Sequence, residues 1–177
     1  MGEEKYDDQR GSYQELGKID ETAKVLGREV SIKQLSLSRN KPRGVLRGIH
    51  AEEMDKLVTP LNGRVFIAIV DIRSNSPTFG KYITFSLDMR DENKSKKTIV
   101  VSRGLGNAFL TIGEESDPAF EYLYQTEKSF RTSVGKRALQ WNDTDVGIPW
   151  PIQPTIISDD DKYNNPTLRV LFPEGFK

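Results

Sequence analysis

Apolar and polar residues alternate along several short stretches of this chain, with the two-residue period that is typical of β-strands. Stretches 29–35 and 82–88 alternate clearly, and in the second of these Ile83, Phe85 and Leu87 share one face. Stretch 64–72 is a nearly continuous apolar run, as in a strand covered on both faces. Three further strands are predicted at 98–102, 108–112 and 120–125. Many short strands at this spacing predict an all-β sandwich or barrel.

Turn-forming residues separate these stretches. Asn62-Gly63 lies between two apolar runs and predicts a two-residue β-hairpin. Further breaks are predicted at 74–77 and 103–106. A single short helix is predicted over 19–26, with acidic residues in its first turn.

The chain has 177 residues and a mass of 20.1 kDa, which is long enough to bury a substantial core. From Pro151 onward proline, aspartate and asparagine are frequent, and this composition predicts an extended C-terminal segment that wraps around the rest. We find no internal repeat and no linker of low complexity. The sequence therefore predicts one domain over residues 1–177.

Charge and hydropathy exclude several partners. Lys and Arg total 26, as do Asp and Glu, so the formal net charge is zero and nothing suggests binding to nucleic acid. The longest apolar run, 65–70, is far shorter than the roughly 20 residues that span a bilayer. The acidic N-terminal segment has no apolar stretch of the secretory type, and the chain has no cysteine. We therefore expect a soluble cytoplasmic protein without a membrane partner.

His50 is the only histidine. Because metal-dependent sites in β-barrel enzymes typically combine several histidines with a carboxylate, we expect neither a metal nor a cofactor. An imidazole changes its charge near neutral pH, which suits a general base. A lone histidine is also compatible with a hydrogen-bonded residue of the core.

Short motifs then point to one family. Residues 44–50 read Gly-Val-Leu-Arg-Gly-Ile-His, and residues 70–80 read Val-Asp-Ile-Arg-Ser-Asn-Ser-Pro-Thr-Phe-Gly. Together with 10–15, 141–143, 147–151 and 157–161, in this order, they resemble the dTDP-4-dehydrorhamnose 3,5-epimerase family of RmlC-like cupins. The resemblance covers nearly the whole chain.

The resemblance implies a cupin-type jelly roll (a double-stranded β-helix) that forms a homodimer by exchange of N-terminal strands. It also implies an activity: epimerisation of a nucleotide-diphosphate-linked 4-keto-6-deoxy sugar, with thymidine diphosphate as the expected carrier and guanosine or cytidine diphosphate as the alternatives. Such a reaction needs a base, an electrophile for the enolate oxygen and an acid on the opposite face. It requires no metal and no nicotinamide.

The family motifs assign roles to individual residues. His50 matches the catalytic base, and Asp161 matches the carboxylate that orients it, although a shift of one residue would give this role to Asp160. Asp71 is a second carboxylate that could support His50, or it could cap the end of a strand.

Three basic residues also match family positions. Lys56 falls where the family places a cation near the enolate oxygen, and Arg47 and Arg10 match residues that bind the diphosphate. Because side chains alternate along a strand, Arg47 and His50 should face opposite sides. They can share a cavity if Gly48 allows a bulge or if they lie at different depths.

Two positions in the expected substrate site depart from the family pattern. Phe130 stands where the family has the general-acid tyrosine, six residues after the aromatic Tyr124. Asn107 replaces a second histidine and can bind a hydroxyl but cannot titrate. A proton must then return from water or from another hydroxyl group, with Tyr122, Tyr124 and Ser129 as the candidates.

A third departure follows His50 directly, where Ala51-Glu52 replaces an aromatic–glutamine pair. Together these changes predict an altered substrate, or a reaction at one stereocentre only. The alternative is a catalytically silent cupin that binds nucleotide sugars or a protein partner.

Overall fold

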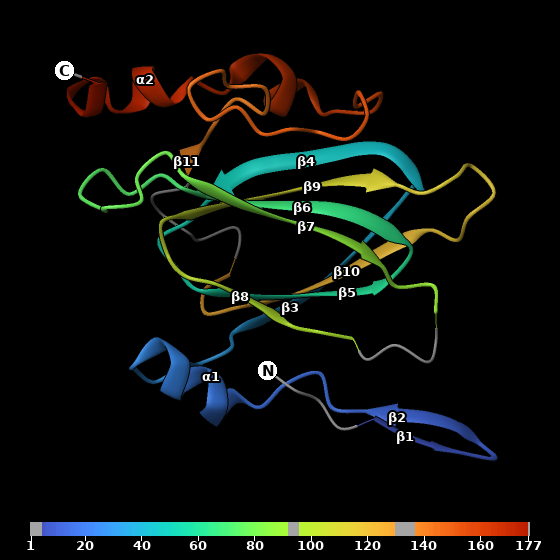
Figure 1. The fold of residues 1–177 in the computed structure, drawn as a ribbon. Helices are drawn as coiled ribbons and strands as arrows, with labels where there is room; N and C mark the ends of the chain where they lie inside the picture. The colour runs from blue at the N-terminus through green and yellow to red at the C-terminus, as the bar shows by residue number, and fades with distance from the viewer. Residues whose placement is uncertain (1–4, 92–95, 130–136, 177) are drawn as a thin grey trace.

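The computed structural model describes residues 5–91, 96–129 and 137–176. Within them, two antiparallel sheets face each other (Figure 1). One sheet contains, in spatial order, β3 (Gln34–Asn40), β10 (Phe120–Thr126), β5 (Lys56–Asn62) and β8 (Ile99–Val101). The other contains β11 (Arg137–Ala138), β4 (Arg43–Ala51), β9 (Leu105–Ile112), β6 (Arg64–Asp71) and β7 (Tyr82–Asp88). The predicted all-β, cupin-type jelly roll is confirmed.

The five-stranded sheet is covered on both faces. Phe109 on one face packs edge-on against Phe120 and Tyr122 of the opposite sheet. On the other face the C-terminal segment lies across β4 and β11 (Figure 1), and Phe66 of β6 packs against Trp150. This double cover explains why β6 reads as a continuous apolar run.

One strand prediction needs correction. The strand predicted at 29–35 instead begins at Gln34, where β3 starts to pair with Thr126 of β10. The strand predicted at 82–88 is confirmed as β7, and Leu87 packs against the core between the sheets. β7 is the edge strand of its sheet, and two residues of its apolar face stay exposed: Ile83 to 58% and Phe85 to 36%. The period of the pattern locates a strand, whereas the neighbouring strands decide its ends and its buried face.

The hairpin predicted at Asn62-Gly63 is wrong. β5 pairs with β10 and β8, and β6 pairs with β7 and β9, so the two strands that this turn joins belong to different sheets. Gly63 has φ 83°, and a Cβ there would lie 2.8 Å from the Cα of Phe120. The glycine therefore forms a tight corner between the sheets.

The helix predicted over 19–26 is confirmed as α1 (Ile19–Leu26), and Gly27 ends it in the left-handed conformation. The C-terminal segment wraps as predicted, but it is not wholly extended. It contains three short helical turns: η1 (Asp160–Asn164), α2 (Leu168–Leu171) and η2 (Pro173–Phe176).

An N-terminal hairpin of β1 (Lys5–Asp8) and β2 (Gly11–Gln14) forms a separate two-stranded sheet on the same side of the molecule as α1 (Figure 1). Its side chains Tyr6 and Tyr13 are 56% and 64% exposed. Within the described ranges, no helix has the length and apolar character needed to cross a membrane.

Candidate active site

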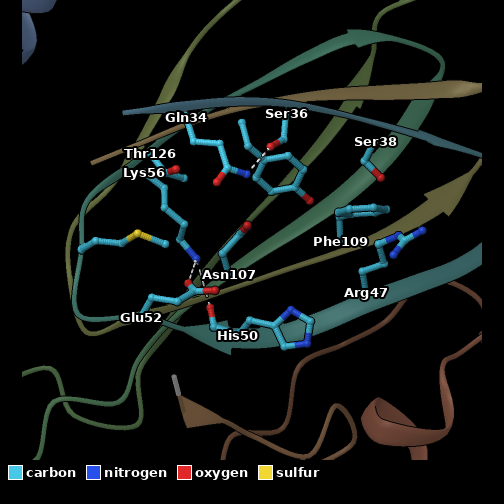
Figure 2. Close-up of a pocket in the computed structure, with 12 residues that line it drawn as sticks. Gln34, Ser36, Ser38, Arg47, His50, Glu52, Lys56, Asn107, Phe109 and Thr126 are labelled. Carbon is cyan, nitrogen blue, oxygen red and sulfur yellow. Dashed lines mark hydrogen bonds and ion pairs between the residues drawn. The ribbon is translucent and has the colours of Figure 1, made fainter. Parts of the chain in front are cut away.

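A cavity of about 300 Å³ opens between the two sheets (Figure 2). It brings together five of the residues singled out in the sequence: Arg47, His50, Lys56, Asn107 and Tyr124. Arg47 and His50 come from β4, and Asn107 comes from β9, in the five-stranded sheet. Lys56 and Tyr124 come from β5 and β10 of the opposite sheet. The cavity is therefore lined from both walls.

A bulge in β4 allows Arg47 and His50 to share this cavity. The register between β4 and β9 shifts between these two residues, and Gly48 lies between them with φ 123°. A Cβ on Gly48 would lie 2.6 Å from the Cβ of Ala108, so only glycine fits here. The sequence-based expectation that Gly48 permits a bulge is confirmed.

His50 lies directly beside a buried carboxylate. Its Nε2 is 2.7 Å from Oδ1 of Asp161, which is only 5% exposed. Asp161 also accepts hydrogen bonds from the backbone N–H of Gly48 and from the side-chain amide of Asn165, both at 3.3 Å. Burial raises the pKa of Asp161, but the hydrogen bond and charge of His50 and the other two donors outweigh burial and hold that pKa below its ordinary value.

The other two aspartates considered for this position lie elsewhere. Asp160 is exposed and accepts a hydrogen bond from Asn164. Asp71 binds the guanidinium of Arg73 and accepts hydrogen bonds from Ser76 and Thr78, all within the loop that follows β6. Asp71 therefore closes the end of β6 and does not support His50.

Lys56 and Glu52 form an ion pair inside the cavity. The ammonium of Lys56 contacts the carboxylate of Glu52 and also donates a hydrogen bond of 3.3 Å to the backbone oxygen of His50 (Figure 2). Lys56 is 5% and Glu52 4% exposed. In the sequence Glu52 stands out as a departure from the family pattern, but nothing there indicates a role in the site.

Two tyrosines of β10 differ in their access to the cavity. Tyr124 lines it, whereas Tyr122 is fully buried beneath it, with ring centroids 4.9 Å apart. Within the described residues the hydroxyl of Tyr122 has no hydrogen-bond partner. Burial raises the pKa of both hydroxyl groups. Phe130 lies outside the described residues, and Ser129 is not among the residues that line the cavity.

Arg47 and Arg10 have different positions. Arg47 lines the cavity and donates a hydrogen bond of 2.9 Å from Nε to the side-chain oxygen of Asn40. Arg10 lies at the turn of the N-terminal hairpin, binds Asp8, and its side chain is 90% exposed. This chain does not bring its own Arg10 to its own cavity.

Sequence reasoning missed several other lining residues, among them Gln34, Ser36 and Ser38 of β3. They are the polar half of an alternating strand whose leucines, Leu35 and Leu37, face outward and are 67% and 58% exposed. A strand with an inward polar face and an outward apolar face is a signal that could have identified them. No group of three or more His, Cys, Asp or Glu side chains in the described part of the chain is arranged to hold a metal ion.

A jelly roll with a histidine–carboxylate pair, a buried lysine and a tyrosine around one sugar-sized cavity defines a cupin-type enzyme that moves protons. Comparison with known proteins narrows this class. Residues 1–169 match the family described as dTDP-4-dehydrorhamnose 3,5-epimerase. The chain belongs to this family of nucleotide-sugar epimerases, which are isomerases.

Individual relatives agree with this assignment. A dTDP-4-dehydrorhamnose 3,5-epimerase of Shigella flexneri is 31% identical over 160 residues, covering 88% of this chain and 83% of the relative. A dTDP-4-dehydrorhamnose 3-epimerase of Streptomyces niveus is 31% identical over 159 residues, covering 88% and 72%. The crystal structure of dTDP-6-deoxy-D-glucose-3,5-epimerase from Legionella pneumophila in complex with dTDP-4-keto-L-rhamnose superposes with a TM-score of 0.80 at 27% identity, covering 98% and 88%.

Proposed function

We propose that this protein epimerises a nucleotide-diphosphate-linked 4-keto-6-deoxy sugar at a carbon next to the ketone, with His50 as the base. The observation that carries the proposal is the contact of 2.7 Å between His50 and the buried Asp161 at the wall of the cavity. The carboxylate fixes the orientation of the ring and stabilises the imidazolium that forms when His50 takes a proton.

The reaction is a proton exchange in two steps. His50 removes the proton from the carbon next to the ketone, and the electrons of the C–H bond move to the carbonyl oxygen to form an enolate. The ammonium of Lys56 stabilises that oxygen by a hydrogen bond and by its charge. A proton then returns to the same carbon from the opposite face, and His50 releases its proton to solvent.

Tyr124 is the proposed acid for the second step. It approaches the cavity from the sheet opposite to that of His50, which is the geometry that inversion requires. Burial raises the pKa of its hydroxyl, so the group is protonated at neutral pH. Tyr124 therefore provides the proton-donating hydroxyl that Phe130 does not have.

We propose a thymidine diphosphate as the carrier, bound in part by Arg47, whose guanidinium can donate two hydrogen bonds to phosphate oxygens. The bound sugar nucleotide of the Legionella structure supports this choice. The Streptomyces niveus relative is named a 3-epimerase, and this name supports a reaction at C3 alone as one form of the proposal. Asn107, whose buried amide nitrogen has no partner among the described residues, is proposed to bind a sugar oxygen.

We also propose that one domain spans residues 1–177 and that two copies form a cytoplasmic homodimer by exchanging their N-terminal strands. The exposed Tyr6 and Tyr13 of the hairpin and the exposed Leu35 and Leu37 of β3 support such an interface. An exchange of hairpins would also carry Arg10 toward the cavity of the second copy.

Solvent-deuterium incorporation into dTDP-linked 4-keto-6-deoxy sugars, read by NMR at C3 and C5 separately, tests the function. We expect incorporation at one or both carbons, and we expect His50→Ala to abolish it. Tight binding of these sugars without any exchange would select the catalytically silent alternative. Neither binding nor exchange with any such sugar would overturn the proposed function.

A further inference from the structure

Glu52 is a buried carboxylate in the cavity that the reaction outlined above does not use. It follows the last residue of β4, and it is 4% exposed. Its backbone oxygen accepts a hydrogen bond of 3.1 Å from the N–H of Gly104, which anchors it to the turn before β9. A carboxylate buried to this degree needs a partner, and its partner is the ammonium of Lys56.

The hydrogen bonds of Lys56 show what Glu52 does to it. An ammonium group has three N–H donors. One is directed to the carboxylate of Glu52, and a second is directed to the backbone oxygen of His50 at 3.3 Å. Both acceptors belong to the same stretch of chain, three residues long, so they hold the ammonium at the end of β4. The described residues offer no further acceptor to Lys56, so the third donor remains for a ligand in the cavity.

The position of this third donor matters for the chemistry. His50, Glu52, Lys56 and Asn107 all line one hollow, and in Figure 2 the amine of Lys56 points toward Glu52 and His50 with Asn107 beside it. An enolate oxygen forms two bonds away from the carbon that His50 deprotonates, so its stabilising donor must lie close to the imidazole. Holding Lys56 against the backbone of His50 achieves this.

We propose that Glu52 is a positioning residue of the epimerisation: it acts through Lys56, by fixing the ammonium beside His50 and by supplying the countercharge that lets a buried cation persist there. This inference rests on the function proposed above. It differs from a direct role, in which Glu52 would bind the substrate itself.

A double-mutant cycle separates these possibilities. The variants are Glu52→Gln, Lys56→Met and the two combined, and the measurement is the first-order rate of deuterium incorporation with saturating sugar nucleotide, together with KM. Glu52→Gln restores the glutamine of the family pattern, but in this chain it leaves the buried ammonium of Lys56 without its countercharge. We therefore expect it to slow the exchange about tenfold or more with KM changed by less than about threefold. In the Lys56→Met background we expect the same change to cause no further loss of rate.

Any result that differs from these expectations overturns the inference. Equal rates for Glu52→Gln and the wild type would show that the carboxylate is not needed. Multiplying effects of the two substitutions would show a direct or merely structural role, and a raised KM at an unchanged rate would indicate a substrate contact. If Glu52→Gln does not fold, Glu52→Asp takes its place. The aspartate keeps the negative charge, but its side chain is one methylene shorter, so the carboxylate lies farther from Lys56.

The matched control is Glu53→Gln, which changes an exposed carboxylate at the next position and should leave the rate unchanged. Thermal melts of every variant report folding independently of turnover. A wild type that exchanges, with a Glu52→Gln variant that is equally fast, overturns the role of Glu52 alone. A wild type that exchanges no sugar overturns the proposed function as well.

Discussion

His50 and Asp161 lie 2.7 Å apart although 111 residues separate them along the chain. The contact exists because the C-terminal segment runs beside β4: Leu46 donates a backbone hydrogen bond of 3.0 Å to Ile156, and Thr155 donates one of 2.9 Å to Gly44. The tail then turns through η1, which directs Asp161 back to the N–H of Gly48. The wrapping tail is therefore part of the proposed active site and not only a cover for the sheet.

The first prediction concerns this pair. We expect Asp161→Asn to slow solvent exchange by roughly 10²–10⁴-fold with little change in KM, because an amide cannot stabilise the imidazolium. The measurement is deuterium incorporation under single-turnover conditions. Asp160→Asn is the matched control, since Asp160 is exposed and contacts Asn164 instead. Equal rates for Asp161→Asn and the wild type would contradict the assigned role.

The second prediction separates the two tyrosines of β10. We expect Tyr124→Phe to reduce the rate of epimerisation by about 10²-fold or more, because this variant cannot return the proton from the opposite face. The rate of deuterium exchange by His50 should fall by a smaller factor. Tyr122→Phe should leave the rate unchanged. It should also leave the melting temperature unchanged or higher, because it removes a buried hydroxyl that has no partner among the described residues. A slow Tyr122→Phe enzyme together with a fast Tyr124→Phe enzyme would reverse the assignment.

The sequence predicts the fold and five of the residues that line the candidate site because its motifs are local. The β4 motif carries Arg47, Gly48 and His50 together, so their order could be read directly, and the glycine indicated the bulge. The pairing of strands across sheets is not local. For this reason Asn62-Gly63 resembled a hairpin turn, although it joins strands of two sheets.

The sequence also could not predict which groups the charged side chains contact. Asp71 ends a buried strand and could have faced His50, but the following loop offers Arg73, Ser76 and Thr78 within hydrogen-bonding distance. The pairing of Glu52 with Lys56 depends on where β4 ends and β5 begins, which the pattern does not give.

The third prediction is a pH dependence of stability. Burial raises the pKa of Asp71, but hydrogen bonds from Arg73, Ser76 and Thr78 outweigh it and hold that pKa well below the ordinary 3.8. The unfolded chain therefore binds a proton here at a higher pH than the folded one. The contribution of Asp71 is complete above about pH 4–5 and is lost as the pH falls toward its folded pKa.

Melting temperatures measured from pH 6 down to pH 2 test this. We expect Asp71→Asn to be less stable than the wild type at pH 6, with the difference shrinking as the pH falls. Glu115→Gln, which changes an exposed carboxylate, should follow the wild-type curve. A difference between Asp71→Asn and the wild type that stays constant across this range would contradict the argument.

The last prediction tests the exchange of N-terminal hairpins. In a dimer with exchanged hairpins, each cavity combines His50 of one copy with Arg10 of the other. A mixed dimer of His50→Ala and Arg10→Ala chains then contains one cavity in which both residues are intact. Random pairing makes half of the dimers mixed, so co-refolded chains should recover roughly one quarter of the wild-type rate, measured at low substrate concentration.

A mixture of His50→Ala and Lys56→Met chains should recover nothing, because these residues line the same chain's cavity and every site lacks one of them. If neither mixture recovers activity although light scattering shows dimers, Arg10 lies outside the site. The exchange of hairpins is then removed from the proposal.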